Sequence, residues 1–122
     1  MLSPELIEKL LEFRRERDWE QFHTAKNLAA ALSVEAGELL DIFRWTRDPE
    51  IPATVASQRA AIAAELADVT IILSYLYHDL GIDPDQAVAE KLERNRAKYP
   101  VEKARGTARK YREIRDGSCG EG

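Results

Sequence analysis

Cysteine and β-strand patterns are nearly absent from this sequence. Its 122 residues include one cysteine, Cys119, so a disulfide within the chain is excluded. Because a chain without disulfides fits a reducing compartment, we expect a cytoplasmic protein. No segment shows a convincing alternation of apolar and polar residues, which argues against a fold built on β-sheets.

The pattern of apolar and charged residues also predicts neither a secretory signal nor a membrane span. Residues 1–4 lead directly into a charged amphipathic segment rather than into the apolar region of a signal peptide. The long apolar run over residues 60–76 carries Glu65 and Asp68 in its middle, and carboxylates inside a membrane are costly. We therefore expect no membrane partner.

The composition that remains is that of one soluble domain with an uneven charge. Apolar residues make up 44% of the chain and charged residues 33%, and the length favours a single domain over residues 1–115 with a flexible tail over 116–122. Residues 91–115 hold ten Lys or Arg against three Glu, whereas the rest holds eight basic and nineteen acidic residues. An acidic body with a basic arm suits a protein that holds cations beside anions.

Apolar periodicity predicts four helices with short connections, which favours an all-α four-helix bundle. The third helix is apolar nearly all round and should be buried on most sides, so we expect a homodimer or homotetramer. The expected helices span about residues 4–17 with Ser3 as N-cap, 25–45 with Thr24 as N-cap, 55–80 closed by Gly81, and 84–98 with Asp83 as N-cap. Gln86 is expected to complete a capping box with Asp83. We expect a connector over residues 17–27, a loop over 46–54 and a basic stretch over 101–115.

Two pairs of acidic residues lie in the most apolar helices. Glu35 and Glu38 are three residues apart, as are Glu65 and Asp68, so each pair shares one helix face and has no basic residue within a turn. If the two helices pack antiparallel, four carboxylates converge and each close pair repels by roughly 4 kcal/mol. Protons or a hard divalent cation must relieve this repulsion. All-oxygen ligation favours Mg²⁺, with Mn²⁺ as a substitute, over zinc.

The acidic residues have two other interpretations. A single Glu-x-x-Glu pair is usually solvated or paired with Lys or Arg, so the four acids carry weight only as a set. A di-iron bundle requires Glu-x-x-His motifs, and neither His23 nor His78 is placed to complete one. Gly37, between the first two acids, costs roughly 1 kcal/mol of helix stability against alanine. It permits either a close approach of a metal, ligand or backbone, or a tight helix crossing.

A basic face and a group of aromatic residues supply the other candidates. Lys91, Asn95 and Lys98 share one face of the fourth helix, which ends at Tyr99; such a face is commonly solvated, but beside a cation cluster it suits phosphate. Three aromatic residues, Trp19, Phe22 and Trp45, fall outside the apolar periodicities and either anchor the core or stack on a flat ligand such as a nucleobase. His23 could hydrogen-bond such a ligand, and His78 has no assigned role.

The ordered set of motifs resembles the MazG-like all-α nucleoside triphosphate pyrophosphohydrolases. Glu35-x-x-Glu38, a spacer of 26 residues and Glu65-x-x-Asp68 match the family's EXXE…EXXD signature, and the spacer has the family's usual length. The blocks ERDWEQFHTAKNLAAALSVEAGEL, FRW, ELADV, NRAKYP and ARGTARKY extend the resemblance over roughly residues 13–111 and indicate the single-domain dCTP pyrophosphatase branch.

The resemblance implies Mg²⁺-dependent cleavage of a nucleoside triphosphate, most simply dCTP or a modified pyrimidine deoxynucleotide, to the monophosphate and pyrophosphate. It implies a metal-activated water that attacks in line, with Glu38 as the hypothetical general base. The implied roles are metal ligation by Glu35, Glu38, Glu65 and Asp68, triphosphate binding by Lys91, Asn95, Lys98 and Tyr99, and a base pocket of Trp19, His23 and Trp45 that subunits could share.

The sequence departs from the branch at two positions, and one alternative function is open. Ala25 replaces a common proline, and Ile72 stands where the vertebrate dCTP enzyme has tyrosine, which weakens the case for strict dCTP preference but not for hydrolysis. The alternative is a non-enzymatic helical module that binds nucleic acid through the basic arm. Because specific nucleic-acid binders usually present a broader basic face, nucleic acid is not the expected partner.

Overall fold

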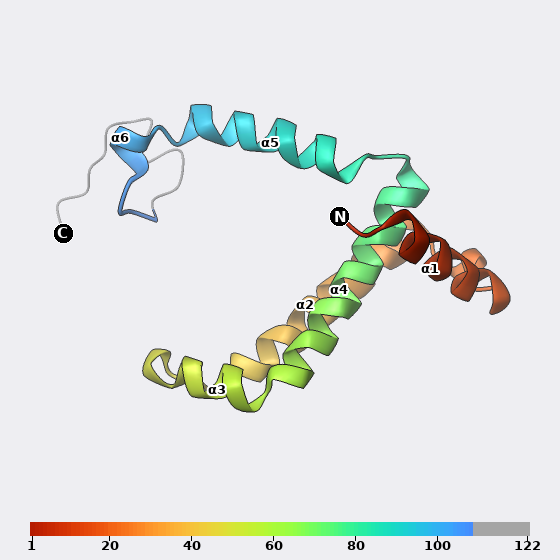
Figure 1. Cartoon of the computed structure of the whole chain (residues 1–122), viewed down its shortest axis with the longest axis horizontal. Helices are drawn as coiled ribbons and strands as arrows, with labels where there is room; N and C mark the ends of the chain where they lie inside the picture. The colour runs from red at the N-terminus through yellow and green to blue at the C-terminus, as the bar shows by residue number, and fades with distance from the viewer. Residues whose placement is uncertain (109–122) are drawn as a thin grey trace. The chain divides into compact units, whose positions relative to one another are not determined.

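The fold is all-α over residues 1–108, the part of the chain that the computed structural model describes (Figure 1). No strand occurs in this part, so the predicted fold class is confirmed. The helices are α1 (Pro4–Glu16), η1 (Glu20–Phe22), α2 (Ala25–Phe43), η2 (Asp48–Glu50), α3 (Ile51–Ser57), α4 (Arg59–Leu80), α5 (Pro84–Lys98) and α6 (Val101–Ala104), where η marks a 3₁₀ turn.

The predicted N-caps all form. The hydroxyls of Ser3 and Thr24 accept hydrogen bonds from the backbone N–H groups of residues 6 and 27, at 3.2 and 3.1 Å. The Asp83 carboxylate accepts from the N–H groups of residues 85 and 86. The reciprocal half of the predicted capping box is wrong, because the Gln86 amide donates to Glu90 at 3.1 Å instead of reaching back to the cap. The α4 helix ends at Gly81 in the left-handed conformation (φ 65°), as predicted.

The segment after α2 differs from the prediction. A loop was expected over residues 46–54 and a single helix over 55–80, but η2 and α3 occupy residues 48–57 and the long helix begins only at Arg59. Pro49 and Pro52 each lie in a first turn, where the missing N–H costs nothing, so prolines that suggested a loop start helical turns instead. The α2 helix ends at Phe43, two residues earlier than expected.

Helices α2 and α4 run antiparallel and side by side, and they make the most extensive helix–helix contact in the described chain (Figure 1). The expected core face of α2 points inward: Leu28 is buried, with only 3% of its surface exposed, and Leu32, Leu39, Ile42 and Phe43 are half-buried. This pairing brings the acidic stretches of the two helices to the same level, which positions the candidate site.

The chain forms two compact units, Met1–Ile82 and the part that begins at Asp83. The first unit contains α1 to α4, and the second contains α5 and α6. The predicted single domain over residues 1–115 and tail over 116–122 stay predictions, because residues 109–122 lie outside the described residues.

The α4 helix is less buried than its sequence suggests. The prediction was burial on most sides, yet Ser74 and Tyr75 are its only buried residues within this chain. By length and composition alone it could cross a membrane, with a mean hydropathy of 1.5 in its most apolar window. Core helices of soluble proteins pass the same test, and Glu65 and Asp68 lie in its middle. Much of its apolar surface is therefore uncovered in a single copy of the described chain.

Candidate functional site

Three glutamates converge between α2 and α4. Glu35 and Glu38 are one helical turn apart on α2, and Glu65 approaches from α4, so that one carboxylate oxygen from each lies within 4.8 Å of the others. The convergence follows from the i,i+3 spacing on α2 and from the antiparallel packing of the two helices. The predicted meeting of acids from the two helices is confirmed for these three residues, which we call the acidic cluster.

The acidic cluster leaves two of its carboxylate oxygens without a hydrogen-bond partner. Oε2 of Glu35 and Oε2 of Glu65 are both shielded from solvent and have no hydrogen-bond partner. Burial, a hydrogen bond with the Glu38 carboxylate and the neighbouring negative charges raise the pKa of Glu35 to about 7. Burial and the Glu38 charge raise the pKa of Glu65 in the same direction. Unpartnered, closely spaced carboxylate oxygens of this kind suit a hard divalent cation that accepts only oxygen ligands.

Asp68 lies at the edge of the acidic cluster rather than in its centre. Its negative charge contributes to the raised pKa of both Glu35 and Glu65, yet it does not belong to the group of three whose oxygens lie within 4.8 Å of one another. The same residue lines a neighbouring pocket. Asp68 therefore connects the acidic cluster to that pocket.

The pocket has a volume of about 500 Å³ and lies within the first unit, between α1, α2, α4 and the segment that joins α1 to α2. Its walls are mainly aliphatic and aromatic, with few polar groups, as is typical of a small-molecule site. It is lined by Leu10, Phe13, Trp19, His23, Asn27, Leu28, Ala31, Asp68, Ile71, Ile72 and Tyr75.

Comparison with known proteins identifies the family of the chain that carries this acidic cluster and pocket. The model of the MazG-like family matches residues 30–114, a range that includes all three clustered glutamates and Asp68. The chain belongs to the MazG-like family. The sequence is 45% identical over 112 residues to dCTP pyrophosphatase 1 of Mus musculus and 43% identical to that of Homo sapiens, which confirms the predicted branch.

The lengths of this MazG-like chain and its relatives differ. Each of these alignments covers 90% of the chain but 66% of the curated relative, so the chain spans slightly less than two thirds of their length. A solved structure, a pyrophosphatase from Archaeoglobus fulgidus, is 43% identical and superposes with a TM-score of 0.77 over 79% of this chain and 90% of that one. The helical arrangement described here is therefore that of a known MazG-like fold.

The aromatic side of the pocket is a series of rings that contact one another. Phe13 and Trp19 meet edge to face with centroids 5.7 Å apart, Trp19 and His23 are 6.4 Å apart, and His23 and Tyr75 are 5.3 Å apart. Nδ1 of His23 is shielded from solvent and has no hydrogen-bond partner. Burial and then the charge of Arg14 lower the pKa of His23, with Asp79 opposing them, so the ring is neutral at pH 7. A neutral ring can both donate and accept a hydrogen bond.

Other predicted site residues of the MazG-like chain lie outside the pocket. Trp45 is 85% exposed just after α2, with the Arg44 guanidinium 5.1 Å from its ring centre. Lys91, Asn95 and Lys98 lie on α5 and Tyr99 caps it, all in the second unit. Within the first unit, therefore, the pocket contains Trp19 and His23 but not Trp45.

Several residues at the site had no assigned role in the sequence interpretation. Phe13 and Tyr75 belong to helices whose apolar periodicity suggested only core packing, although Tyr75 lies two turns beyond Asp68 on the same helix face. Arg14 was not singled out, yet it forms an ion pair with Asp79 at 2.8 Å. His78, which has no assigned role from the sequence, has its Nδ1 3.0 Å from the Asp79 carboxylate. For Arg14, the available signal in the sequence was its position as a basic residue within the apolar stripe of the first helix.

Proposed function

We propose that this chain is a nucleoside triphosphate pyrophosphohydrolase that acts on dCTP or a modified pyrimidine deoxynucleotide. The reaction adds water across the anhydride between the α- and β-phosphoryl groups and releases the monophosphate and pyrophosphate. The observation that carries the proposal is the acidic cluster beside an aromatic pocket, joined by Asp68. Similarity to proteins named dCTP pyrophosphatase 1 supports the choice of substrate class. Removal of surplus or modified nucleotides in the cytoplasm is the expected role.

Mg²⁺ is the proposed metal, with Mn²⁺ as a substitute. Glu35, Glu38 and Glu65 would hold it, with Asp68 as the fourth proposed ligand, because their oxygens are hard donors and two of them are shielded without a partner. A bound divalent cation supplies neutralisation of phosphate charge and a lowered pKa of bound water. Glu38 is the more exposed of the α2 pair and remains the proposed general base.

The pocket is proposed to hold the nucleobase. Trp19 offers a flat face, and His23 offers a neutral ring with an unpartnered nitrogen. Ile72 lines the same pocket, so the position that departs from the vertebrate enzyme lies where the base would be recognised. Stacking of a base on an aromatic side chain is worth roughly 1–3 kcal/mol.

The remaining predicted residues are assigned by their chemistry. Lys91, Asn95, Lys98 and Tyr99 are proposed to bind the triphosphate, since Lys and amide groups donate to phosphate oxygens. Trp45 is proposed to complete the base pocket of another subunit, because a largely exposed tryptophan that follows α2 can reach a second copy of the chain. A homodimer or homotetramer is proposed on the same ground and on the uncovered apolar surface of α4.

The experiment that tests the proposal is pyrophosphate release from a panel of nucleoside triphosphates, with Mg²⁺ and with EDTA. We expect Mg²⁺-dependent release, with one pyrimidine deoxynucleotide well ahead of the purines. Lack of release from every nucleotide, in a protein that still binds Mg²⁺, would contradict it. The alternative nucleic-acid module would instead show RNA or DNA affinity that falls steeply with salt and no turnover.

Variants at the two tryptophans test the pocket assignment. Trp19→Ala should raise the KM for dCTP by roughly 5- to 150-fold, the range that corresponds to loss of one stacking contact. Trp45→Ala should weaken nucleotide affinity more than Mg²⁺ affinity. Phe22→Ala, at another exposed aromatic residue outside the pocket, is the control and should leave KM unchanged. Equal loss of nucleotide and metal affinity in Trp45→Ala would remove Trp45 from the pocket.

A further inference from the structure

Arg14 and Tyr75, two of the four buried residues in the described part of the chain, lie at or behind the pocket. Arg14 and Tyr75 are each only 6% exposed, whereas most large apolar side chains of the same unit are half-buried or exposed. Tyr75 lines the pocket and Arg14 lies behind it, in contact with the Tyr75 ring. A charged side chain that is nine-tenths buried is costly unless it is paired, so its partners carry information about its role.

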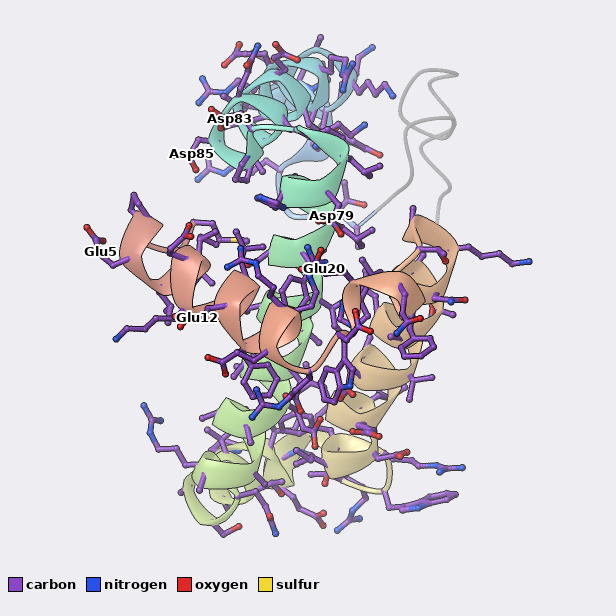
Figure 2. The ribbon with its side chains drawn as sticks, turned by 90° about the vertical axis from the view of Figure 1, so that its right-hand side faces the viewer. Glu5, Glu12, Glu20, Asp79, Asp83 and Asp85 are labelled. Carbon is purple, nitrogen blue, oxygen red and sulfur yellow. The ribbon has the colours of Figure 1, made fainter. Side chains whose placement is uncertain are left out.

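Arg14 is held through its two terminal nitrogens, whereas its Nε is shielded from solvent and has no hydrogen-bond partner. Its Nη1 and Nη2 donate to Oδ2 and Oδ1 of Asp79, each at 2.8 Å, which is the bidentate geometry of a guanidinium with a carboxylate. The Arg14 hydrogen bond is the main reason that the pKa of Asp79 falls to about 2, so the carboxylate is ionised at pH 7. Figure 2 labels Asp79 on the part of α4 next to α1. The pair thus fixes the plane of the guanidinium.

That plane in turn fixes Tyr75. The guanidinium carbon of Arg14 lies 4.6 Å from the centre of the Tyr75 ring, and the Tyr75 hydroxyl donates to the backbone carbonyl of Leu10 at 2.9 Å. The ring is therefore held at its face by Arg14 and at its tip by Leu10. Its other neighbour is His23, at 5.3 Å between centroids, and His23 continues the series of rings to Trp19.

We propose that Arg14, through Asp79 and Tyr75, is a positioning residue for the base pocket, which sets the orientation of the Tyr75–His23 wall against which the nucleobase packs. This inference rests on the proposed function and adds Arg14 and Asp79, which do not line the pocket. The competing explanation is that the pair merely fastens α1 to α4. An apolar pair can join two helices at least as well as a buried ion pair. If the ion pair only joins α1 to α4, an apolar replacement should preserve both stability and dCTP affinity. If it positions the pocket wall, the same replacement should preserve stability but weaken dCTP affinity.

The test replaces both charges together. Arg14→Met/Asp79→Leu removes the ion pair without leaving a lone buried charge. The matched control, Arg47→Met/Glu50→Leu, makes the same replacements in an exposed pair between η2 and its N-cap residue. We measure kcat and KM for dCTP, dCTP affinity by quenching of tryptophan fluorescence, inhibition by inorganic tripolyphosphate, and the melting temperature. Tripolyphosphate has no base, so it reports on the phosphate subsite alone.

We expect KM and the dissociation constant for dCTP to rise by roughly tenfold, which lies within the range for loss of a base–aromatic stacking contact, with kcat within about twofold. Tripolyphosphate inhibition, the melting temperature and the control pair should change little. An unchanged KM in the folded double variant would overturn the proposal. A parallel loss of dCTP and tripolyphosphate binding would also overturn it, since that pattern indicates a general loosening.

A conservative variant covers the case in which the double variant fails to fold. Arg14→Lys keeps the charge beside Asp79 but loses the bidentate fork and the flat face against Tyr75, so KM for dCTP should still rise. Wild-type KM in Arg14→Lys would overturn the proposal. Failure of the wild-type protein to bind or cleave any nucleotide would instead refute the proposed function and this inference with it. A wild-type protein that cleaves dCTP beside an unaffected variant would refute this inference alone.

Discussion

Glu35 shows how one residue combines the fold and the chemistry of the site. It lies on the inner face of α2, where apolar neighbours should surround it, yet its shielded oxygen has no partner. Its raised pKa of about 7 means that the folded chain binds a proton there that the unfolded chain releases above pH 4.5. The metal-free protein therefore loses stability from this group as the pH rises from about 4.5 through 7.

Replacing one cluster glutamate tests the metal assignment. Glu65→Gln should lower Mg²⁺-dependent turnover by at least about 100-fold, since even outer-shell changes cost 10- to 100-fold. It should also abolish the rise in melting temperature on adding Mg²⁺. In the wild-type protein this rise should be larger at pH 8 than at pH 6, because protons compete for Glu35. Glu12→Gln, at an exposed position on α1 (Figure 2), is the control. A Mg²⁺ response retained in Glu65→Gln would remove Glu65 from the ligands.

Asp79 gives a second prediction at this scale, with the opposite sign. Its pKa lies at about 2 in the folded chain, below the ordinary 3.8, so the pair with Arg14 stabilises the fold fully above pH 4. That stability should be lost as the pH falls through about 2. Denaturant unfolding at pH 5, 3 and 2 measures it. Asp79→Asn should be less stable at pH 5 and should lose less between pH 5 and 2; a wild-type slope in that variant would contradict the prediction.

Helix ends were predicted correctly where nearby side chains determine them, and features that nearby side chains do not determine were missed. Caps at Ser3, Thr24 and Asp83 and the stop at Gly81 follow from side-chain chemistry within four residues, so the sequence locates them. The break at Gln58 does not follow, because apolar periodicity runs through it. The acidic cluster was predictable from two i,i+3 pairs and one antiparallel packing. The Arg14–Asp79 pair was not, since its partners are 65 residues apart and the apolar stripe around Arg14 does not identify Asp79 as the partner.

Two glycines give matched predictions about the helices. Gly37 lies within α2, and a Cβ there would meet nothing within 4 Å, so no tight crossing occurs inside the described chain. Gly37→Ala should therefore stabilise the fold by about 0.5–1 kcal/mol. Gly81→Ala should destabilise it by roughly 1–2 kcal/mol, because φ there is 65°. Denaturant unfolding measures both. If Gly37→Ala is stable but inactive, the glycine serves a ligand or a second subunit; a destabilised Gly37→Ala would contradict the prediction.

At the scale of the whole molecule, one copy of the chain leaves an unusual amount of apolar surface uncovered. Leu28 and Tyr75 are the only buried hydrophobic residues among those the structure describes, while Val34 and Leu40 on α2 and Leu66 on α4 are each about half exposed or more. A chain of this length usually buries more when it folds alone. We expect copies of the chain to assemble through the exposed apolar side chains of α2 and α4.

Light scattering should therefore give two or four times the chain mass of 13.8 kDa. Leu40→Glu should weaken assembly by tenfold or more, because burying a leucine contributes roughly 1.5–3 kcal/mol. Val101→Glu, at an exposed apolar residue on α6, is the control outside the α2–α4 pair. A monomeric wild-type protein, or assembly equally weakened by both variants, would contradict the prediction.

Asp68 belongs to the pocket wall and also acts on the carboxylates of the acidic cluster. A cation and a nucleotide bound as proposed would share this residue, so their affinities would be coupled. Thermodynamic linkage requires that, if the cation changes nucleotide affinity by some factor, the nucleotide changes cation affinity by the same factor. A cell in which free Mg²⁺ falls would then lose nucleotide occupancy as well, so this chain would respond to the product of two concentrations rather than to either alone.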